Sequence, residues 1–413
     1  MVVPTNCQTN AVEGGSVWYN NYTRDPVHTQ QIYHVDGPAG TGKTTCVKLL
    51  IERLGLSPEQ VAFATISAKA ADVLRKQGMP CDTIASTFYS YQRRDDEEVA
   101  QCEAALHVAV AKNEDKKQIA ALKKALAEAR QPIRILNPTS VLLIKLIVLD
   151  ECSMINQQTA ADILSLRCPI ILIGDRAQLP PPEGVYGFKD IKPDASLKEI
   201  TRQAQGSPII RLSLMARRGD YIPSNRYGEQ VWKIPGKIYD PSIYAGLDQT
   251  ICGFNKTRVK INQQTRQFLG YDGKLPIGPA QKLIMRRNRR DLGLFNGQFI
   301  TMNNVIPLDD LTALADVTTD TGETFLSIPI YTGRFMEPDL KDEERKYRDF
   351  RLFERFLDID YAYALTCHLA QGSGFHGVCV FDDGWGFADK IDRKCWLYTA
   401  ITRASETLVI LGK

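Results

Sequence analysis

The fold is decided by one stretch of the sequence, Gly37-Pro38-Ala39-Gly40-Thr41-Gly42-Lys43-Thr44-Thr45. It follows a short apolar segment at residues 32–35 and precedes an amphipathic segment at residues 46–54, so it joins a predicted strand to a predicted helix. In that context glycines allow backbone N–H groups to curl around phosphates, and the helix N-terminus adds a favourable dipole. We therefore predict that the whole stretch binds a nucleotide, with Lys43 on its β- and γ-phosphates and the Thr44 hydroxyl on Mg²⁺.

Two series of aliphatic segments predict two sheets. The first series comprises residues 61–65, 141–149 and 169–173, and the second comprises residues 249–253, 282–285, 378–381 and 407–411. Segments that are aliphatic nearly throughout are typical of parallel strands buried on both faces. Those of the first series end in polar clusters, and open α/β sheets place ligand sites at that carboxyl edge. The sequence therefore predicts two α/β domains, the first of which carries the phosphate-binding loop.

A pair of carboxylates, Asp150 and Glu151, ends the predicted strand at residues 141–149. We expect Asp150 to hold Mg²⁺ through water and Glu151 to polarise an attacking water as general base. The phosphate-binding loop taken alone would also suit a simple nucleotide kinase. The carboxylate pair favours hydrolysis over phosphoryl transfer to a small acceptor.

Composition limits the class of protein. The chain has 413 residues, of which 44% are hydrophobic and 24% charged, with a formal net charge of +3. These values exclude collagen-like, disordered and membrane classes. Ten cysteines without a CxxC pair argue against a zinc ribbon or a disulfide framework and favour reduced, mostly buried thiols. Because the net charge is small, a nucleic-acid partner would have to bind in a local groove.

A third motif, Gly174-Asp175-Arg176-Ala177-Gln178-Leu179-Pro180-Pro181, follows the predicted strand at residues 169–173. Taken in order with the phosphate-binding loop and the carboxylate pair, it resembles the superfamily 1 helicases of the 5′-to-3′ branch, and among them the RecD- and Dda-like enzymes. The resemblance continues through residues 197–203, 207–209, 363–373 and 396–404. It implies an α/β fold of two tandem RecA-like motor domains, with ATP and Mg²⁺ bound in the cleft between them.

The resemblance also assigns roles around the nucleotide. Gln178 would sense the γ-phosphate, and Arg202 and Arg403 would reach that phosphate from across the cleft. Charge spreads onto the γ-phosphoryl oxygens in the transition state, so an arginine that arrives on domain closure would tie hydrolysis to motion. Three more residues would bind the nucleotide: Gln8, which would grip adenine, together with Gln371 and Gly372.

The expected nucleic-acid contacts also come from the resemblance. Single-strand binders combine phosphate contacts, which do not depend on base sequence, with stacking aromatic rings. Phe88 is either such a ring or a buried aromatic, and His368 is either a contact or a core histidine. The full set comprises Ser67, Lys69, Thr83, Ser86 and Phe88 in the first domain, and Asn255, Lys256, Thr366 and His368 in the second.

The predicted domain order has two interruptions. Motor domain 1 takes residues 1–90 and 140–218, and motor domain 2 takes residues 219–298 and 361–413. Residues 91–139 form an insertion that we predict to be helical, because residues 95–131 are rich in Ala, Lys, Glu and Leu. Residues 299–360 correspond by resemblance to a small SH3-like β-rich subdomain. Dda-like relatives carry a strand-splitting β-hairpin in the first insertion, so the position of a wedge is left open.

We predict from these features an ATP-dependent DNA helicase that moves 5′ to 3′ on single-stranded DNA and unwinds duplex. Three alternatives stay open: an RNA helicase of the same superfamily, a translocase within a larger recombination or nuclease complex, and a non-catalytic binding scaffold. The intact motifs argue against the scaffold.

The expected partners are single-stranded DNA, single-strand–duplex junctions and a single-strand-binding, replication or recombination protein, with the enzyme itself a monomer. No signal peptide opens the sequence, and the longest apolar run falls far short of the roughly 20 residues that span a bilayer. We therefore expect no membrane contact and a cytoplasmic location, and a chain this compact would suit a phage-encoded protein acting in a host cytoplasm.

Overall fold

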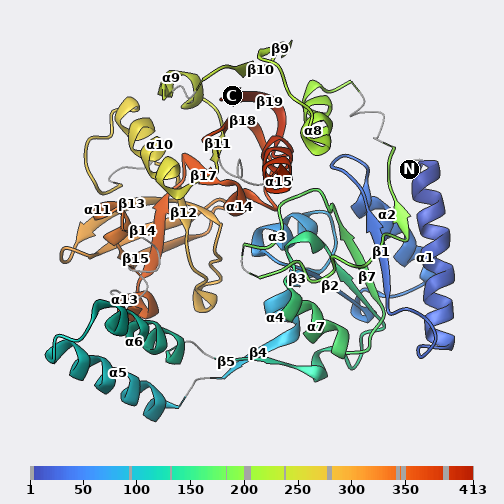
Figure 1. The fold of residues 1–413 in the computed structure, drawn as a ribbon, viewed down its shortest axis with the longest axis horizontal. Coiled ribbons are helices and arrows are strands. Elements are labelled where there is room, and N and C mark those ends of the chain that lie inside the picture. Colours follow the sequence, from blue (N-terminus) through green and yellow to red (C-terminus); the bar gives the residue numbers. More distant parts are fainter. Residues whose placement is uncertain are drawn as a thin grey trace.

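The computed structural model describes residues 4–92, 95–130, 133–182, 184–199, 206–236, 239–276, 281–340, 345, 350–384 and 390–412. It consists of two α/β domains, a small closed barrel and a helical insertion (Figure 1). The predicted fold class, two α/β motor domains with inserted subdomains, is confirmed.

The first domain is built on six parallel strands in the order β3-β2-β6-β7-β1-β8. The strands are β1 (Ile32–Asp36), β2 (Val61–Thr65), β3 (Cys81–Thr83), β6 (Leu146–Leu149), β7 (Ile170–Gly174) and β8 (Ala195–Ser196). Alternate strand residues face opposite sides, and each side is covered by helices. One face packs on α1 (Asn6–Arg24), α2 (Lys43–Leu54) and α3 (Ala68–Lys76), and the other on α4 (Ile84–Phe88) and α7 (Gln157–Ser165).

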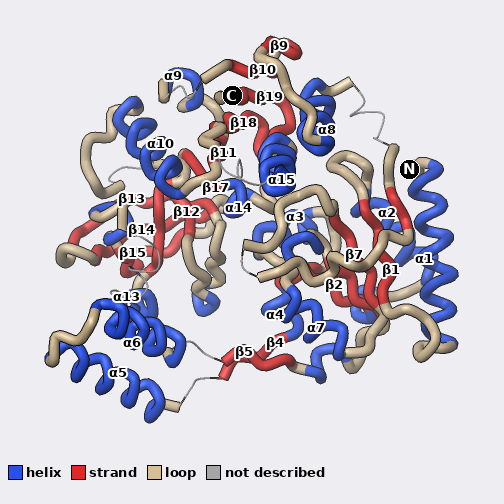
Figure 2. Tube along the Cα trace, in the orientation of Figure 1, coloured by secondary structure: helices blue, strands red, loops and turns tan. Residues whose placement is uncertain are grey.

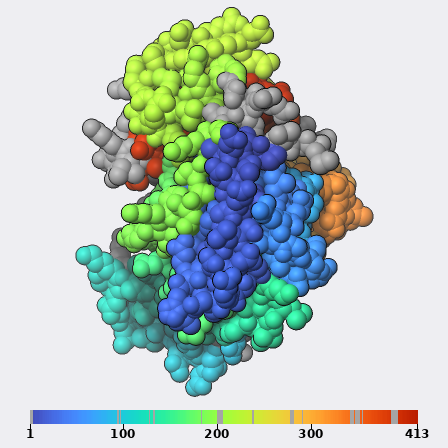
Figure 3. All heavy atoms as spheres, turned by 90° about the vertical axis from the view of Figure 1, so that its right-hand side faces the viewer, coloured from blue at the N-terminus to red at the C-terminus, as the bar shows by residue number. Residues whose placement is uncertain are grey.

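Two features of this domain differ from the sequence analysis or extend it. The strand predicted at residues 141–149 begins only at Leu146, because Pro138–Val141 form a short 3₁₀ helix and Leu142 and Leu143 are exposed. Helix α1 lies along the outside of the domain, where a space-filling view shows its full length at the surface (Figure 3). Its N-terminus is closed by a capping box between Thr5 and Gln8.

The second domain has a six-stranded sheet in the order β17-β11-β18-β19-β10-β9, parallel except for the β9–β10 pair. The strands are β9 (Asn225–Gly228), β10 (Val231–Ile234), β11 (Gln249–Cys252), β17 (Ala364–Thr366), β18 (Phe375–Phe381) and β19 (Ala404–Leu411). Its helices are α8 (Pro208–Arg218), α9 (Pro241–Tyr244), α10 (Asn255–Phe268), α14 (Cys367–Ala370) and α15 (Lys390–Ile401). Helices α8, α14 and α15 cover one face and α9 and α10 the other.

The barrel closes in the order β12-β13-β14-β15-β16. Its elements are β12 (Leu283–Met285), β13 (Phe299–Pro307), β14 (Thr312–Thr319), β15 (Thr324–Tyr331) and β16 (Leu357–Tyr361), with α11 (Gly333–Met336) and α13 (Phe350–Arg355). Residues 282–285 were expected in the second α/β sheet, and that prediction is wrong. Leu283 pairs with Ile300 and Tyr361 and is buried in the barrel core. A short apolar segment suits any buried strand, so its pattern does not reveal which sheet it joins.

The first insertion is helical at its tip and a β-ribbon at its base (Figures 1 and 2). Helices α5 (Asp96–Ala111) and α6 (Lys116–Ala129) pack on each other, and they are reached through an antiparallel pair, β4 (Tyr89–Gln92) and β5 (Ile133–Leu136). The sequence indicated the helices but not the ribbon, whose strands are only four residues long.

All ten cysteines are free, and eight of them are buried. In the part of the chain that the structure describes, no helix combines the length and the hydrophobicity needed to cross a membrane.

Candidate functional site

The phosphate-binding loop connects β1 to α2, as predicted. Gly40 and Gly42 have left-handed backbones with φ of 81° and 72°, a region that side chains disfavour. At Gly37 a Cβ atom would lie 2.8 Å from the carbonyl oxygen of Leu197, which excludes larger residues. The Lys43 ammonium donates to the carbonyl oxygen of Gly37 at 2.7 Å. The lysine therefore folds back over its own loop.

The carboxylate pair lies at the carboxyl end of β6, beside the loop. Asp150 and Thr44 are the two polar residues that line a small cavity, whose other lining residues are apolar. Burial, and then the neighbouring Glu151 carboxylate, raise the pKa of Asp150 to about 6. A cation between these groups would relieve that cost, and hydroxyl and carboxylate oxygens are ligands that Mg²⁺ prefers. Thr44 and Asp150 thus have the oxygen donors that a magnesium site needs, and that site stays a prediction.

Gln178 and Gln371 lie at the boundary between the two α/β domains. Both side chains are buried, and within the described ranges neither amide oxygen has a hydrogen-bond partner. The Gln371 amide nitrogen donates to the carbonyl oxygen of Leu179 at 3.2 Å, and the Leu179 N–H donates to the Thr399 hydroxyl at 2.9 Å. Two buried amide acceptors are therefore held at the junction, ready for a water or a ligand N–H.

A polar network that the sequence analysis missed ties the loop to the second domain. Arg217 on α8 pairs with the fully buried Asp175 at 2.6 Å and with Asp36 at 3.8 Å. The Tyr398 hydroxyl on α15 donates to Asp175 and accepts from the backbone N–H of Ala39 at 3.2 Å. Burial raises the pKa of Asp175, and Arg217 is the largest influence that opposes this. The loop, the end of β7 and two helices of the second domain thus share one network.

Arg217→Met is expected to lower the free energy of unfolding by about 2 kcal/mol, because it leaves Asp175 buried without its cation. We place the effect below the roughly 3–5 kcal/mol typical of a broken buried ion pair, because Arg217 is itself 23% exposed. The neighbouring Arg218→Met is the matched control, since Arg218 pairs with Asp220 on the surface. Denaturant midpoints would check this. Equal denaturation midpoints for the two variants would show that the Arg217–Asp175 ion pair does not stabilise the fold.

Of the two arginines predicted to reach the γ-phosphate, the structure describes only Arg403. Arg202 belongs to the segment 200–205, which lies outside the described residues. Arg403 is buried, and its three nitrogens donate to the Thr399 carbonyl at 3.1 Å, the Ser373 carbonyl at 3.2 Å and the Thr402 hydroxyl at 3.1 Å. All three acceptors belong to the second domain, so none of these hydrogen bonds reaches the loop. Its role stays a prediction.

The structure shows the surroundings of Gln8 and Gly372, two residues predicted to bind the nucleotide. The Gln8 amide nitrogen donates to the carbonyl oxygen of Thr41 at 3.0 Å, and its oxygen accepts from the backbone N–H of Thr5 at 2.9 Å. Both ends of the amide are therefore used within the chain, and contact with adenine stays a prediction. At Gly372, where φ is 71°, a Cβ atom would lie 3.1 Å from the Ser67 hydroxyl. Gly372 thus lies against the start of α3, and its contact with the nucleotide stays a prediction.

One expected nucleic-acid contact is wrong. Phe88 is fully buried in the core under α4, packed with Ile84 and Ile147, and cannot stack on a base. The side chains of Thr83, which caps the N-terminus of α4, and Ser86 within α4 hydrogen-bond to each other at 2.8 Å near the surface. The remaining contacts in this region are therefore polar.

Lys69 lies in a cluster of two lysines and two phenyl rings, the lysine–phenylalanine cluster. Its ammonium is 4.1 Å from the ring centre of Phe299 and 5.1 Å from that of Phe375, and the Lys282 ammonium is 5.0 Å and 5.7 Å from the same rings. The rings meet edge to face at 6.1 Å. Burial lowers the pKa of both lysines to about 8. The cluster joins α3, the barrel and the second sheet. The sequence analysis did not identify Lys282, Phe299 and Phe375 as functional residues.

The second-domain candidates lie at two helix starts. Asn255 and Lys256 are exposed at the N-terminus of α10, where the Asn255 oxygen accepts from Arg258 at 3.2 Å. Thr366 directly precedes α14, and His368 is half-buried in it. Burial lowers the pKa of His368, so its neutral form is favoured. Lys256 is thus the exposed cation among these four residues.

Taken together, a phosphate-binding loop and an acidic pair at the edge of one parallel sheet, closed by a second α/β domain, define a two-domain P-loop ATPase. The model of the family described as AAA domain matches residues 23–230, half of the chain, and the chain belongs to that family. A second model, described as UvrD-like helicase C-terminal domain, matches residues 361–411. The predicted membership of the superfamily 1 helicases is confirmed.

Solved structures share the fold at low sequence identity. A Pif1 helicase from Candida albicans is 15% identical over 100% of this chain and 95% of its own, with a TM-score of 0.51. A Bacteroides Pif1 bound to single-stranded DNA is 16% identical over 99% and 92%, with a TM-score of 0.52. A Pif1 structure on unwinding at forked double-stranded DNA has the same identity and coverage, with a TM-score of 0.53. No curated protein sequence matches the chain.

Proposed function

We propose that the protein is an ATP-dependent DNA helicase that moves 5′ to 3′ along single-stranded DNA and unwinds duplex. One observation carries the proposal: the nucleotide-binding loop is hydrogen-bonded to the second domain. The backbone N–H of Ala39 in the loop donates to Tyr398, and the backbone N–H of Leu179, in the segment that follows β7, donates to Thr399. A loop that rearranges around phosphates has to change these contacts, so nucleotide binding and domain motion are coupled.

In the proposed reaction, Lys43 leaves the carbonyl oxygen of Gly37 and binds the β- and γ-phosphates of ATP. Thr44 and Asp150 would hold Mg²⁺, which would neutralise phosphate charge. Glu151 accepts a proton from the attacking water. Arg202 and Arg403 approach the γ-phosphate as the domains close, and Gln178 senses it.

The proposed path of the strand crosses both α/β domains. It uses phosphate contacts that do not depend on base sequence. The first domain would supply Ser67, Lys69, Thr83 and Ser86, and the second Asn255, Lys256, Thr366 and His368. The similarity to a Pif1 bound to single-stranded DNA and to a Pif1 studied on forked duplex supports single-stranded DNA and its junctions as the substrate. We extend the proposal to a monomer that works with a single-strand-binding, replication or recombination protein.

Strand displacement on matched duplexes with a 5′ or a 3′ single-stranded tail tests the proposal. We expect ATP-dependent opening of the 5′-tailed duplex alone, abolished in Lys43→Ala. Opening of only the 3′-tailed duplex would overturn the direction. Stimulation of ATP hydrolysis by RNA rather than DNA would identify an RNA helicase. DNA-stimulated hydrolysis without opening would indicate a translocase that depends on a larger complex.

A further inference from the structure

The hydroxyl of Tyr398 on α15 is fully engaged, and its side chain is fully buried. It donates its proton to the Asp175 carboxylate, and it accepts from the backbone N–H of Ala39 at 3.2 Å and from Arg217 at 3.3 Å. A hydroxyl has one proton and two lone pairs, so none of its hydrogen-bonding capacity is left over. Burial raises the pKa of Tyr398, so the hydroxyl keeps its proton.

This hydroxyl connects the second domain directly to the phosphate-binding loop. Among the hydrogen bonds of the described residues, the bond from Ala39 to Tyr398 is the only one that joins residues 37–45 to the second domain. Other bonds across the junction, such as the one from Leu179 to Thr399, end outside the loop. A displacement of α15 relative to the first domain therefore acts on the loop through the tyrosine hydroxyl.

Helix α14 packs on α15 within the second domain. The Cys367 thiol of α14 donates to the carbonyl oxygen of Trp396 on α15 at 3.7 Å, and both side chains are fully buried. Trp396 lies two residues before Tyr398 on the same helix. Because this contact is close-packed, a shift of α14 is passed on to α15 and to its tyrosine.

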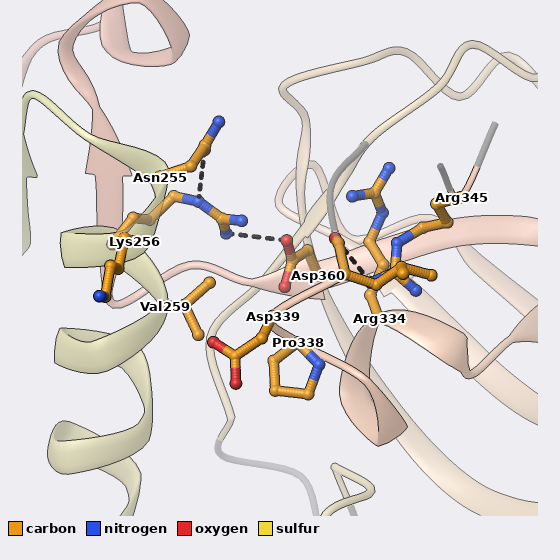
Figure 4. A pocket seen from close by; sticks show the side chains of 10 residues that line it. Asn255, Lys256, Val259, Arg334, Pro338, Asp339, Arg345 and Asp360 are labelled. Atoms are coloured by element: carbon orange, nitrogen blue, oxygen red, sulfur yellow. Dashed lines mark hydrogen bonds and ion pairs between the residues drawn. The ribbon is translucent and has the colours of Figure 1, made fainter. Parts of the chain in front are cut away.

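The proposed strand-binding residues of the second domain lie on both faces of its sheet. Thr366 directly precedes α14 and His368 lies in it, and α14 covers the same face as α15. Asn255 and Lys256 begin α10 on the opposite face, beside a cavity of about 660 Å³ (Figure 4). The α14 side therefore offers the short route from a bound strand to the loop.

We propose that the Tyr398 hydroxyl is a positioning group for the phosphate-binding loop, through which a strand bound beside α14 raises the rate of ATP hydrolysis. This rests on the proposed function, because it requires a strand-dependent ATPase. The strand shifts α14, α15 follows, and the hydroxyl moves the Ala39 N–H and the Asp175 carboxylate. Without the hydroxyl Asp175 still has Arg217 as its counter-ion, so the hydroxyl orients these groups rather than neutralising charge. Contacts of this kind tie a chemical step to a conformational change.

Steady-state ATP hydrolysis by the full chain, with and without saturating oligothymidylate, tests the proposal. In Tyr398→Phe we expect the strand-stimulated kcat to fall about tenfold, while the strand-free rate and the KM for ATP stay within about threefold of wild type. Phenylalanine preserves the ring and its packing and removes only the hydroxyl. Tyr244→Phe is the matched control and should keep full stimulation. Tyr244 is buried in the same domain, and its hydroxyl has no hydrogen-bond partner among the described residues.

His368→Ala tests whether the signal passes through α14. It should also lower the stimulation at saturating strand, and adding Tyr398→Phe should cause no further loss, because both changes interrupt one route. Losses that multiply in the double variant would show that the strand acts on the loop by another route and would overturn the proposal.

Amide hydrogen exchange of residues 37–42 in the wild type gives a readout that does not depend on the folding of a variant. It should change when oligothymidylate binds, and an unchanged exchange would overturn the proposal. Circular dichroism and melting temperatures establish that each variant is folded. A folded Tyr398→Phe with wild-type stimulation would reduce the hydroxyl to a structural contact and leave the helicase function standing. A wild type whose ATP hydrolysis no strand stimulates would overturn the proposed function as well.

Discussion

Glu151→Gln is expected to slow ATP hydrolysis about a thousandfold while ATP binding changes little, because an amide of the same shape cannot accept the proton of the attacking water. Glu151 follows Asp150 at the end of β6, and its backbone N–H donates to the Asp150 carboxylate at 2.8 Å. Glutamine preserves that backbone contact and removes only the basic oxygen. Single-turnover hydrolysis and fluorescent-nucleotide binding would separate the two effects.

The control for Glu151→Gln is Glu52→Gln, an exposed carboxylate on α2 of the same domain. It should hydrolyse ATP at the wild-type rate. If Glu151→Gln retained hydrolysis within about tenfold of wild type, the general base would have to be another group.

The backbone at Glu151 supplies a second check on the same residue. Its φ of 51° is a left-handed conformation that typically costs a non-glycine residue about 1–3 kcal/mol. Such strain is retained where the side chain has a function, so Glu151→Gly should be at least as stable as wild type and equally inactive in hydrolysis. A variant that lost stability instead would indicate that the side chain has a structural role.

The nucleotide site could be predicted because its parts are local in sequence. Strand, glycine loop and helix follow one another within residues 32–54, and Asp150 and Glu151 directly follow an aliphatic run. Each of these signals depends on neighbours along the chain, which a single sequence displays. The same reasoning found the aliphatic strands of the two α/β sheets, but it missed the short strands β3, β8, β9, β10 and β17 and placed residues 282–285 in the wrong sheet.

The contacts between domains could not be predicted, because their partners are far apart in sequence. Asp175 and Tyr398 hydrogen-bond across 223 positions, and Leu179 and Thr399 across 220. Arg217 resembles any exposed helix-terminal arginine until α8 is placed against the first domain.

The predicted contact of Phe88 with nucleic acid is wrong for a related reason. Its helix has only five residues, too few to show a periodicity, and burial of the ring depends on how α4 packs on the first sheet. A match to a motif therefore does not show whether the matched side chain is buried or exposed.

The affinity for single-stranded DNA is expected to fall about a hundredfold between pH 7 and pH 9, about tenfold for each lysine of the lysine–phenylalanine cluster. Burial lowers the pKa of Lys69 and Lys282 to about 8 in the free protein. Below that pH both are charged and attract phosphate, and above it both are neutral. A bound phosphate would raise both pKa values, so binding takes up protons and weakens as the pH rises through 8.

The groups around the two lysines do not reverse this sign. Asp320 raises the pKa of Lys69 and Lys76 lowers it, while Asp248 raises the pKa of Lys282 and Lys69 lowers it, and the values near 8 already include these influences. The cluster therefore holds two cations close together beside two rings. The two like charges repel each other, so a bound phosphate would stabilise the charged forms of both lysines.

Fluorescence anisotropy with oligodeoxyadenylate from pH 7 to pH 9 would measure the effect. Lys69→Gln and Lys282→Gln should each bind more weakly at pH 7 and each lose about tenfold of the pH dependence, because a glutamine cannot titrate. Lys48→Gln, on α2 of the first domain, should retain the full dependence. A wild-type affinity that is flat through pH 8 would mean that the strand passes elsewhere and that the cluster serves only to join α3 to the barrel and the second sheet.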